Sequence, residues 1–184
     1  MLVVRNDNRS ADVLPSPVSP DLFRKGMRRL AGVCTIITSA DASRDQEGWV
    51  GLTATAVSSV TADPPRILVC VNRSAFAHAT IVSAGVLGVN VLAAENGVSM
   101  ASRFGGGPGP AIKKFEDGLW NLGSLGVPLL KDCLLSLECV VDSIVKNSTH
   151  DIIICDVVGI HDAAECNEPL IYFNGSFRSP EIFC

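Results

Sequence analysis

The strongest constraint on the fold of this chain is a pair of long apolar segments near its carboxyl end. Residues 133–146 and 151–161 are rich in valine, isoleucine, leucine and cysteine, and only the polar stretch 147–150 separates them. Segments of this composition favour strands. Two strands joined by so short a connection pair antiparallel, because a parallel crossover needs a dozen or more residues. The sequence therefore predicts a long β-hairpin.

Shorter segments of similar character occur along the rest of the chain. Strands are predicted at residues 33–39, 49–56, 57–62, 67–72, 85–92 and 170–173, and short helices at 75–83 and 93–104. The residues Asp63-Pro64-Pro65 interrupt strand pairing, because proline has no N–H to donate. Residues 111–130 carry little regular signal. Many short strands with few helices indicate a mainly β fold, a closed or half-closed β-barrel with short helical insertions, and the missing βα alternation disfavours a doubly wound parallel sheet.

The amino-terminal part divides into an arm and the start of a folded domain. Residues 1–18 lack the long apolar core of a signal peptide, and we expect them to form a flexible or partner-wrapping arm. Residues 19–184 are expected to form one domain that opens on a helix, with Ser19 as its cap and Pro20 in its first turn. The helix is expected to run to about residue 31, with Leu22, Phe23, Met27 and Leu30 as its inner stripe.

Composition narrows the classes of function. The 184 residues carry a net charge of −4 without a basic run, which argues against nucleic acid as a partner. No apolar stretch reaches the roughly 18 residues that cross a membrane. Charged residues make up only 18% of the chain, which fits either buried subunit surface or an open apolar ligand site.

The seven cysteines form no Cys-x-x-Cys pair, and most lie in apolar, strand-like runs. This pattern is typical of reduced, buried thiols in a cytoplasmic protein. No cluster of histidine, cysteine and aspartate has the spacing of metal ligands. We therefore expect a cytoplasmic protein without a metal site.

The segment 51–65, GLTATAVSSVTADPP, is the first candidate for a binding site. Five hydroxyl side chains stand among small alanines and valines in it: Thr53, Thr55, Ser58, Ser59 and Thr61. Such alternation can be ordinary sheet with one wet face. Hydroxyls and backbone N–H groups are also suitable donors to a phosphate or to the polar edge of a flat ring, and small side chains let such a ring approach the backbone. Composition alone leaves both interpretations open.

Several stretches, in their order and spacing, resemble the short-chain flavin reductases with an FMN-binding split barrel. They are LFRKGMRRLAGVCTIIT, GLTATAVSSVTADPPRILVCVNR, GVNVLAAE, THD before a strand, and LIYFNGSFR. The resemblance implies a Greek-key split β-barrel and an NAD(P)H:flavin oxidoreductase. Such an enzyme transfers hydride from NADH or NADPH to FMN, with FAD as an alternative. It also implies a homodimer that supplies reduced flavin to a partner monooxygenase.

The resemblance also assigns site residues. The flavin would lie along Thr53, Ala54, Thr55, Ala56 and Val57, with its phosphate held by Ser58, Ser59, Asn72, Arg73 and Ser74. Backbone groups of Asn90, Leu92 and Ala93 would face the flavin, Phe104 would close over it, and Phe177 and Arg178 would flank the nicotinamide. Phe177 stands where many relatives carry tyrosine, which keeps an aromatic lid but removes a phenolic hydrogen bond. His150, in THD, would contact the nicotinamide or its phosphates, and is the candidate catalytic residue.

Alternatives to this assignment stay open. Without the resemblance, His150 is better explained as a turn residue bonded to nearby backbone, and Phe104 is equally well explained as a core residue. The protein could hold FMN as a prosthetic group and reduce another acceptor, such as a cob(II)alamin-type corrin. It could also be a flavin-binding barrel without enzymatic activity. The glycines of residues 105–110 lack the ending of a phosphate loop, and no G-x-G-x-x-G fingerprint occurs.

Overall fold

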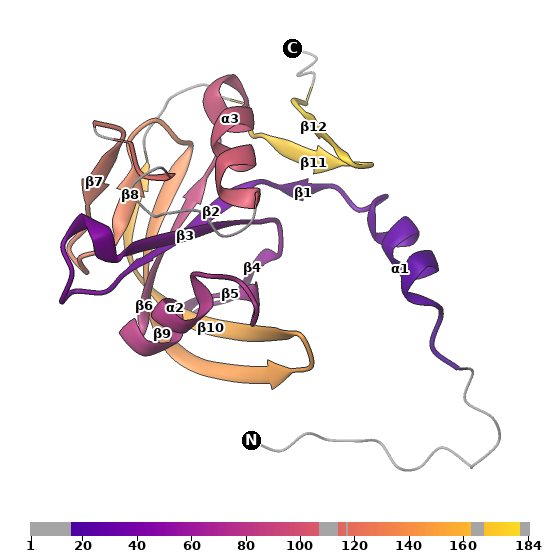
Figure 1. The fold of residues 1–184 in the computed structure, drawn as a ribbon, viewed down its shortest axis with the longest axis horizontal. Coiled ribbons are helices and arrows are strands. Elements are labelled where there is room, and N and C mark those ends of the chain that lie inside the picture. The colour runs from indigo at the N-terminus through magenta and orange to yellow at the C-terminus, as the bar shows by residue number, and fades with distance from the viewer. Residues whose placement is uncertain (1–15, 107–113, 117, 163–167, 181–184) are drawn as a thin grey trace.

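The computed structural model describes residues 16–106, 114–116, 118–162 and 168–180. Its centre is a seven-stranded antiparallel sheet in the order β3-β2-β6-β9-β10-β5-β4. The strands are β2 (Thr35–Ala40), β3 (Trp49–Ala54), β4 (Val57–Ala62), β5 (Pro65–Asn72), β6 (Val86–Val91), β9 (Leu135–Asn147) and β10 (His150–Asp162). The long hairpin predicted from the sequence is β9–β10, and it lies in the middle of the sheet (Figure 1).

The two edges of this sheet are consecutive in the chain. β3 and β4 stand at opposite ends of the strand order, yet only Thr55 and Ala56 separate Ala54 from Val57. The three Cα–Cα steps from Ala54 to Val57 span at most about 11 Å, so the sheet must curl until its edges come together. The curled sheet is the half-closed β-barrel expected from the sequence.

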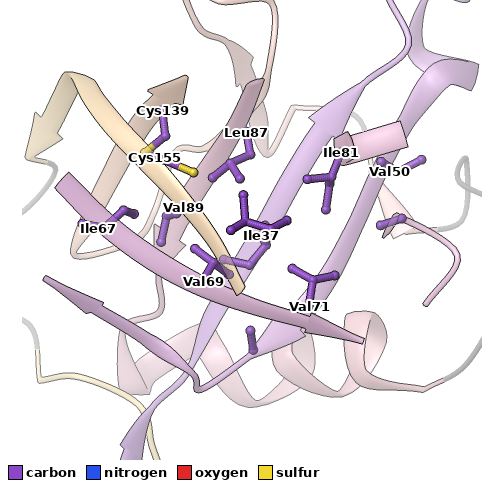
Figure 2. Packing of buried hydrophobic residues seen from close by; sticks show 13 residues of the cluster. Ile37, Val50, Ile67, Val69, Val71, Ile81, Leu87, Val89, Cys139 and Cys155 are labelled. Atoms are coloured by element: carbon purple, nitrogen blue, oxygen red, sulfur yellow. The ribbon is translucent and has the colours of Figure 1, made fainter. Parts of the chain in front are cut away.

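The interior of the barrel is apolar. Side chains from β2, β3, β5, β6, β9 and β10 meet there, and Ile81 of α2 (His78–Ala84) closes one end (Figure 2). Ile37 points into this interior, whereas its neighbour Ile36 faces the opposite side of β2, because successive side chains of a strand alternate. Both residues are fully buried, so β2 is covered on both faces. Each such side chain contributes roughly 1.5–3 kcal/mol by burial.

The outer face of β2 is covered by a second apolar cluster. It lies beneath α3 (Ala94–Gly105) and the hairpin of β7 (Trp120–Leu122) and β8 (Pro128–Leu130). Phe104 makes edge contacts with Phe115 and Trp120, at centroid distances of 5.1 and 5.6 Å. The sequence predicted α3 but not the β7–β8 hairpin.

A three-stranded sheet lies beside the barrel, in the order β1-β11-β12. It comprises β1 (Gly32–Val33), β11 (Ile171–Phe173) and β12 (Ser176–Arg178). It connects to α1 (Pro20–Met27), which projects away from the barrel (Figure 1). The Asn174 N–H donates to Arg28 O at 2.8 Å and thereby ties the end of α1 to the β11–β12 turn.

The expected start of α1 is confirmed, and its expected packing is wrong. Ser19 caps the helix, its side chain accepting from Leu22 N at 3.3 Å. The helix ends at Met27 rather than near residue 31, and the expected inner stripe (Leu22, Phe23, Met27 and Leu30) is exposed. The stripe has the spacing of a buried helix face, but among the residues that the structure describes no element covers it.

The thiols within the described residues are free. Burial raises the pKa of Cys139 and of Cys155 to about 12, so neither ionises near neutral pH. Cys166 and Cys184, like most of the arm 1–18, lie outside the described residues. Among the helices that the structure describes, none is long and apolar enough to span a bilayer.

Candidate functional site

A pocket of about 680 Å³ opens beside the junction of β3 and β4, close to the carboxyl end of α3. That volume lies in the usual range for small-molecule sites. The residues that line it come from β3, the β3–β4 connection, β5, the β5–α2 connection, the end of α3, Lys114 beyond it and the start of β10. They are Gly51, Leu52, Thr53, Ala54, Thr55, Ala56, Cys70, Asn72, Ser74, Ala75, Phe76, Ala77, Phe104, Gly105, Lys114 and His150.

One wall of the pocket is made of small residues packed on α3. A Cβ added at Gly51 would come within 2.7 Å of the Phe104 ring, so only glycine lets this ring lie against β3. The Thr53 hydroxyl donates to Ala101 O of α3 at 2.7 Å. Thr53 therefore joins strand to helix, and its oxygen can still accept a hydrogen bond from a ligand.

The opposite wall carries polar groups on the β5–α2 connection and on β10. The Asn72 side-chain oxygen accepts from the Ser74 N–H at 2.9 Å and from the Ser74 hydroxyl at 2.8 Å, which fixes a tight turn. The Asn72 amide nitrogen can therefore donate to a ligand. His150 Nδ1 lies 2.9 Å from the Thr149 hydroxyl, so Nε2 is the ring nitrogen that can reach into the pocket. These groups suit an anionic or carbonyl-bearing ligand.

A buried carboxylate supports this wall from behind. Asp151 is 3% exposed at its side chain, and its Oδ2 lies 2.8 Å from His78 Nε2 on α2. Its Oδ1 lies 3.8 Å from Arg73 Nε. The pair of Asp151 and His78 ties β10 to α2, whose preceding residues line the pocket.

Lys114 brings a positive charge to the α3 side of the pocket. It is 9% exposed, and its ammonium lies 5.9 Å from the centroid of the Phe104 ring, in cation–π range. Burial lowers the pKa of Lys114. No aspartate or glutamate occurs among the lining residues of this pocket, so its charge is zero or positive.

Part of the site predicted from the sequence lies in this pocket. Its wall includes Thr53, Ala54, Thr55, Ala56, Asn72, Ser74, Phe104 and His150. Phe104 is 3% exposed and belongs to the aromatic cluster, so its core role is confirmed together with its place at the pocket.

Four other predicted residues lie beside the pocket rather than in its wall. Val57 is half-buried and packs on the barrel interior. Ser58 and Ser59 are exposed on the edge strand β4. Arg73 is half-exposed and donates to Ser148 O at 3.3 Å. Their assignment to the flavin and its phosphate stays a prediction.

Asn90, Leu92 and Ala93 do not line this pocket, and their assignment to the flavin stays a prediction. All three are buried away from it. The Asn90 side chain donates to Ile36 O and accepts from Leu130 N, at 3.0 and 2.8 Å. The N–H and carbonyl of Leu92 pair with Cys34 and Leu170. The Asn90 side chain and the Leu92 backbone thereby hold β6 and the residues that follow it against their neighbours.

Phe177 and Arg178 lie on β12 of the small sheet, outside the pocket of their own chain. The Phe177 ring contacts Tyr172 at a centroid distance of 5.5 Å, and Arg178 is exposed. Their role beside the nicotinamide stays a prediction. It would require that a second copy of the chain bring its own Phe177 and Arg178 to this pocket.

Sequence reasoning missed several residues of the wall. Lys114 stands in KKFEDGLW, in the segment judged irregular; a lysine among aromatic residues was the available signal. Cys70 was noted only as a buried thiol, although the pocket reaches it. Phe76 is 60% exposed at the start of α2, a position no strand pattern indicates.

Comparison with known proteins shows the family to which the chain belongs. The sequence profile of the flavin reductase like domain matches residues 27–181. RutF 2, an FMN reductase (NADH) from Rhizobium rhizogenes (strain K84 / ATCC BAA-868), is 39% identical over 169 residues, covering 90% of this chain and 94% of that protein.

Two solved structures share the fold over most of their length. A candidate flavin reductase from Haemophilus somnus 129PT has a TM-score of 0.82 and 35% identity, covering 89% of this chain and 100% of that one. BorF, the flavin reductase component of a bacterial two-component tryptophan halogenase, has a TM-score of 0.77 and 27% identity, covering 88% and 98%. The chain described here therefore belongs to the family of the flavin reductase like domain.

Proposed function

We propose that this protein is an NADH-dependent FMN reductase whose flavin site is the pocket lined by residues 51–56. The observation that carries the proposal is the composition of that pocket in a chain 39% identical to an FMN reductase (NADH). Small side chains form one wall, polar donors form the other, and no carboxylate opposes an anionic ligand. An NAD(P)H:flavin oxidoreductase is also the activity that the family resemblance of the sequence implied.

The residues present fit a flavin mononucleotide. Gly51, Ala54 and Ala56 leave room for a flat ring against β3, and the hydroxyls of Thr53 and Thr55 supply polar contacts at its edge. The Asn72 amide N–H would donate to a phosphate, while Ser74, whose N–H and hydroxyl both donate to Asn72, would hold that side chain in place. FMN, once bound, supplies the chemistry by accepting a hydride from NADH. The protein then needs only to hold the two ligands in register and to exclude water.

His150 acts on the nicotinamide side in this proposal. His150 is exposed and lines the pocket, as Phe104 also does. Thr149 holds Nδ1, which leaves Nε2 to bind the carboxamide or a phosphate of NADH. No residue has to donate or remove a proton during hydride transfer.

We further propose that the protein is a cytoplasmic homodimer that passes reduced flavin to an oxygenase-type partner. BorF is named as the reductase component of such a pair. Exposed apolar residues on α1 and the small sheet support the dimer, because an isolated helix of this length is marginal in water. A contribution of the partner's β12 would bring Phe177 and Arg178 to the nicotinamide. Residues 1–18 would form the arm that wraps the partner.

The direct test is anaerobic reduction of FMN, FAD and riboflavin by NADH and by NADPH. We expect the visible absorbance of FMN to bleach fastest with NADH. Protein that binds FMN but leaves it oxidised with both nucleotides is a non-enzymatic flavin binder, and protein that binds no flavin contradicts the whole proposal. Saturation kinetics with free FMN then separate flavin as substrate from a tightly held prosthetic group that serves another acceptor.

A further inference from the structure

Asp151 is a buried carboxylate that hydride transfer itself does not require. Its side chain is 3% exposed, and it follows His150 at the start of β10. Oδ2 lies 2.8 Å from Nε2 of His78, whereas Oδ1 accepts no hydrogen bond from any residue that the structure describes. A carboxylate held out of water needs partners, because burial penalises a charge. The residues around Asp151 therefore indicate what it does.

The two basic side chains beside Asp151 belong to one short segment of the chain. Arg73, whose Nε lies 3.8 Å from Oδ1, comes directly after β5, and His78 opens α2. Both ends of the segment 73–78 thus converge on the same carboxylate. The four residues between these ends all line the pocket: Ser74, Ala75, Phe76 and Ala77. Asp151 therefore closes the loop that carries this part of the pocket wall.

Beyond its first residue, the backbone hydrogen bonds of this segment are local among the described residues. The Ala75 N–H donates to Asn72 O and the His78 N–H donates to Ala75 O, each at 3.0 Å, in two successive turns. Such turns fix the shape of the segment but not its distance from the sheet. Phe76 is 60% exposed and adds little packing. Segments with few buried apolar contacts open at low free-energy cost, so the contact from Asp151 on β10 helps to decide where this wall lies.

We propose that Asp151 is a positioning residue, which through His78 and Arg73 holds the wall of residues 74–77 in the place where the pocket binds flavin; this inference rests on the proposed function. Asp151 is not itself a lining residue of the pocket. Its substitution can therefore change flavin binding only through the residues that it holds. An effect through its neighbour His150 is distinguishable, because His150 acts on NADH rather than on flavin in the proposed function.

The test is a double-mutant cycle in the full-length protein with Asp151→Asn and His78→Phe. Asp151→Asn keeps the shape of the side chain and removes its charge, and His78→Phe keeps a ring and removes the contact between the two residues. Each substitution is expected to raise the dissociation constant of FMN about tenfold. The double variant should show about the same tenfold loss, because both substitutions break one contact. kcat at saturating FMN and NADH should stay near the wild-type value.

Asp156→Asn is the matched control for this cycle. Asp156 pairs with Arg66 at 2.6 Å between β10 and β5, and neither residue lines the pocket. The control should leave the dissociation constant of FMN unchanged. If the buried Asp151→Asn substitution prevents folding, His78→Phe carries the test, since the His78 side chain is 16% exposed.

Hydrogen exchange and urea unfolding separate positioning from plain stability. Without any ligand, the amides of residues 74–78 should exchange faster in both single variants and at the wild-type rate in Asp156→Asn. Variants that are less stable in urea yet bind FMN as the wild type does would overturn the inference, because Asp151 would then have a structural role only. Additive losses in the double variant, or a raised KM for NADH with unchanged FMN binding, would overturn it as well. Wild-type protein that binds no flavin would instead refute the proposed function.

Discussion

At the scale of single residues, His150 is the most informative position in the proposed site. His150→Gln is expected to raise KM for NADH about tenfold, a loss of about 1.4 kcal/mol in binding. The reason is that glutamine cannot reproduce the contact that the ring Nε2 makes in this proposal. FMN affinity and kcat should change little, because in this proposal the contacts to the flavin ring come from residues 51–56 rather than from His150. Steady-state kinetics with varied NADH and with varied FMN measure kcat and the KM for each ligand.

The matched control for this change is His161→Gln. His161 lies outside the pocket and pairs with Glu138 at 2.8 Å. The His161→Gln substitution should leave KM for NADH at the wild-type value. Equal effects of the two substitutions, or a His150→Gln protein with unchanged KM, would make His150 a turn residue.

A substitution at Gly51 tests how closely the aromatic cluster of Phe104, Phe115 and Trp120 must approach β3. Gly51→Ala places a Cβ within 2.7 Å of the Phe104 ring and 3.2 Å of Ile37 O. Phe104 cannot yield easily, because Phe115 and Trp120 hold it. We expect a loss of about 1–3 kcal/mol in unfolding free energy, together with weaker FMN binding.

Urea unfolding and FMN titration measure the two effects of Gly51→Ala. Gly26→Ala on α1 is the matched control, since a Cβ there meets nothing within 4 Å. It should be neutral or slightly stabilising, as alanine is the better helix former. A Gly51→Ala protein as stable as the wild type would show that the cluster has room to shift.

Single residues also show where sequence reasoning reaches its limit. Thr55 and Ala56 could be predicted at the pocket, because a hydroxyl among small residues on one strand is a local signal. Lys114 could not, since its place depends on how the segment after α3 packs on Phe104. The resemblance assigned the Asn90 backbone to the flavin, and no local pattern indicated that its side-chain amide would satisfy Ile36 and Leu130 in the core.

At the scale of elements, Glu138 joins the central hairpin to the β7–β8 hairpin. Its carboxylate accepts from Leu125 N at 2.8 Å and from the Ser124 hydroxyl at 3.1 Å, and its other oxygen lies 2.8 Å from His161. The side chain is 2% exposed. Burial by itself raises the pKa of Glu138, but these hydrogen bonds outweigh it and hold the pKa below its ordinary value.

This lowered pKa predicts how stability depends on pH. A carboxyl with a lower pKa in the folded than in the unfolded chain adds stability above the unfolded value, about 4.3. That contribution is lost as pH falls through the folded pKa. Glu138→Gln should therefore be less stable than the wild type at neutral pH, by roughly 1.5–3 kcal/mol, and the gap should narrow toward acidic pH.

Urea unfolding at neutral and at acidic pH measures this gap. Glu47→Gln, an exposed glutamate, is the matched control and should show no gap at either pH. A gap for Glu138→Gln that stays constant with pH would show that the amide disturbs packing instead of removing a charge.

The elements that could be predicted are those with long or repeated signals. β9 and β10 have 13 residues each, and their composition alone indicated strands. β7 and β12 have three residues each and depend on their partners for stability, so no pattern within them identifies a strand. The exposed face of α1 has the spacing of a buried helix, and no local signal tells which molecule covers it.

At the scale of the whole molecule, the curl of the sheet decides where the site lies. The chain leaves β3 and enters β4 at the opposite edge after two residues. The pocket reaches this junction, and it also reaches α2, α3 and β10, which are far apart in sequence. The hydroxyl-rich segment could therefore be predicted to bind a ligand, but the rest of the wall required the closed shape.

The exposed face of α1 leads to a prediction about assembly. Leu22 and Phe23 are each 58% exposed, and no residue of the helix is buried. Nearby on the small sheet, Tyr172 and Phe173 are also partly exposed. Apolar residues gathered at one end of a molecule indicate a protein–protein contact. We expect a homodimer in solution, measured by light scattering on a size-exclusion column.

Phe23→Glu should weaken this dimer at least tenfold, because it buries a carboxylate in an apolar contact. Lys25→Glu, on the same helix, is the matched control and should leave the dimer intact. If the partner's β12 completes the nicotinamide site, monomeric Phe23→Glu protein should bind FMN nearly as the wild type does while its KM for NADH rises. A wild-type protein that is monomeric at micromolar concentration would refute the dimer. A monomeric variant with unchanged KM would show instead that each pocket is complete within one chain.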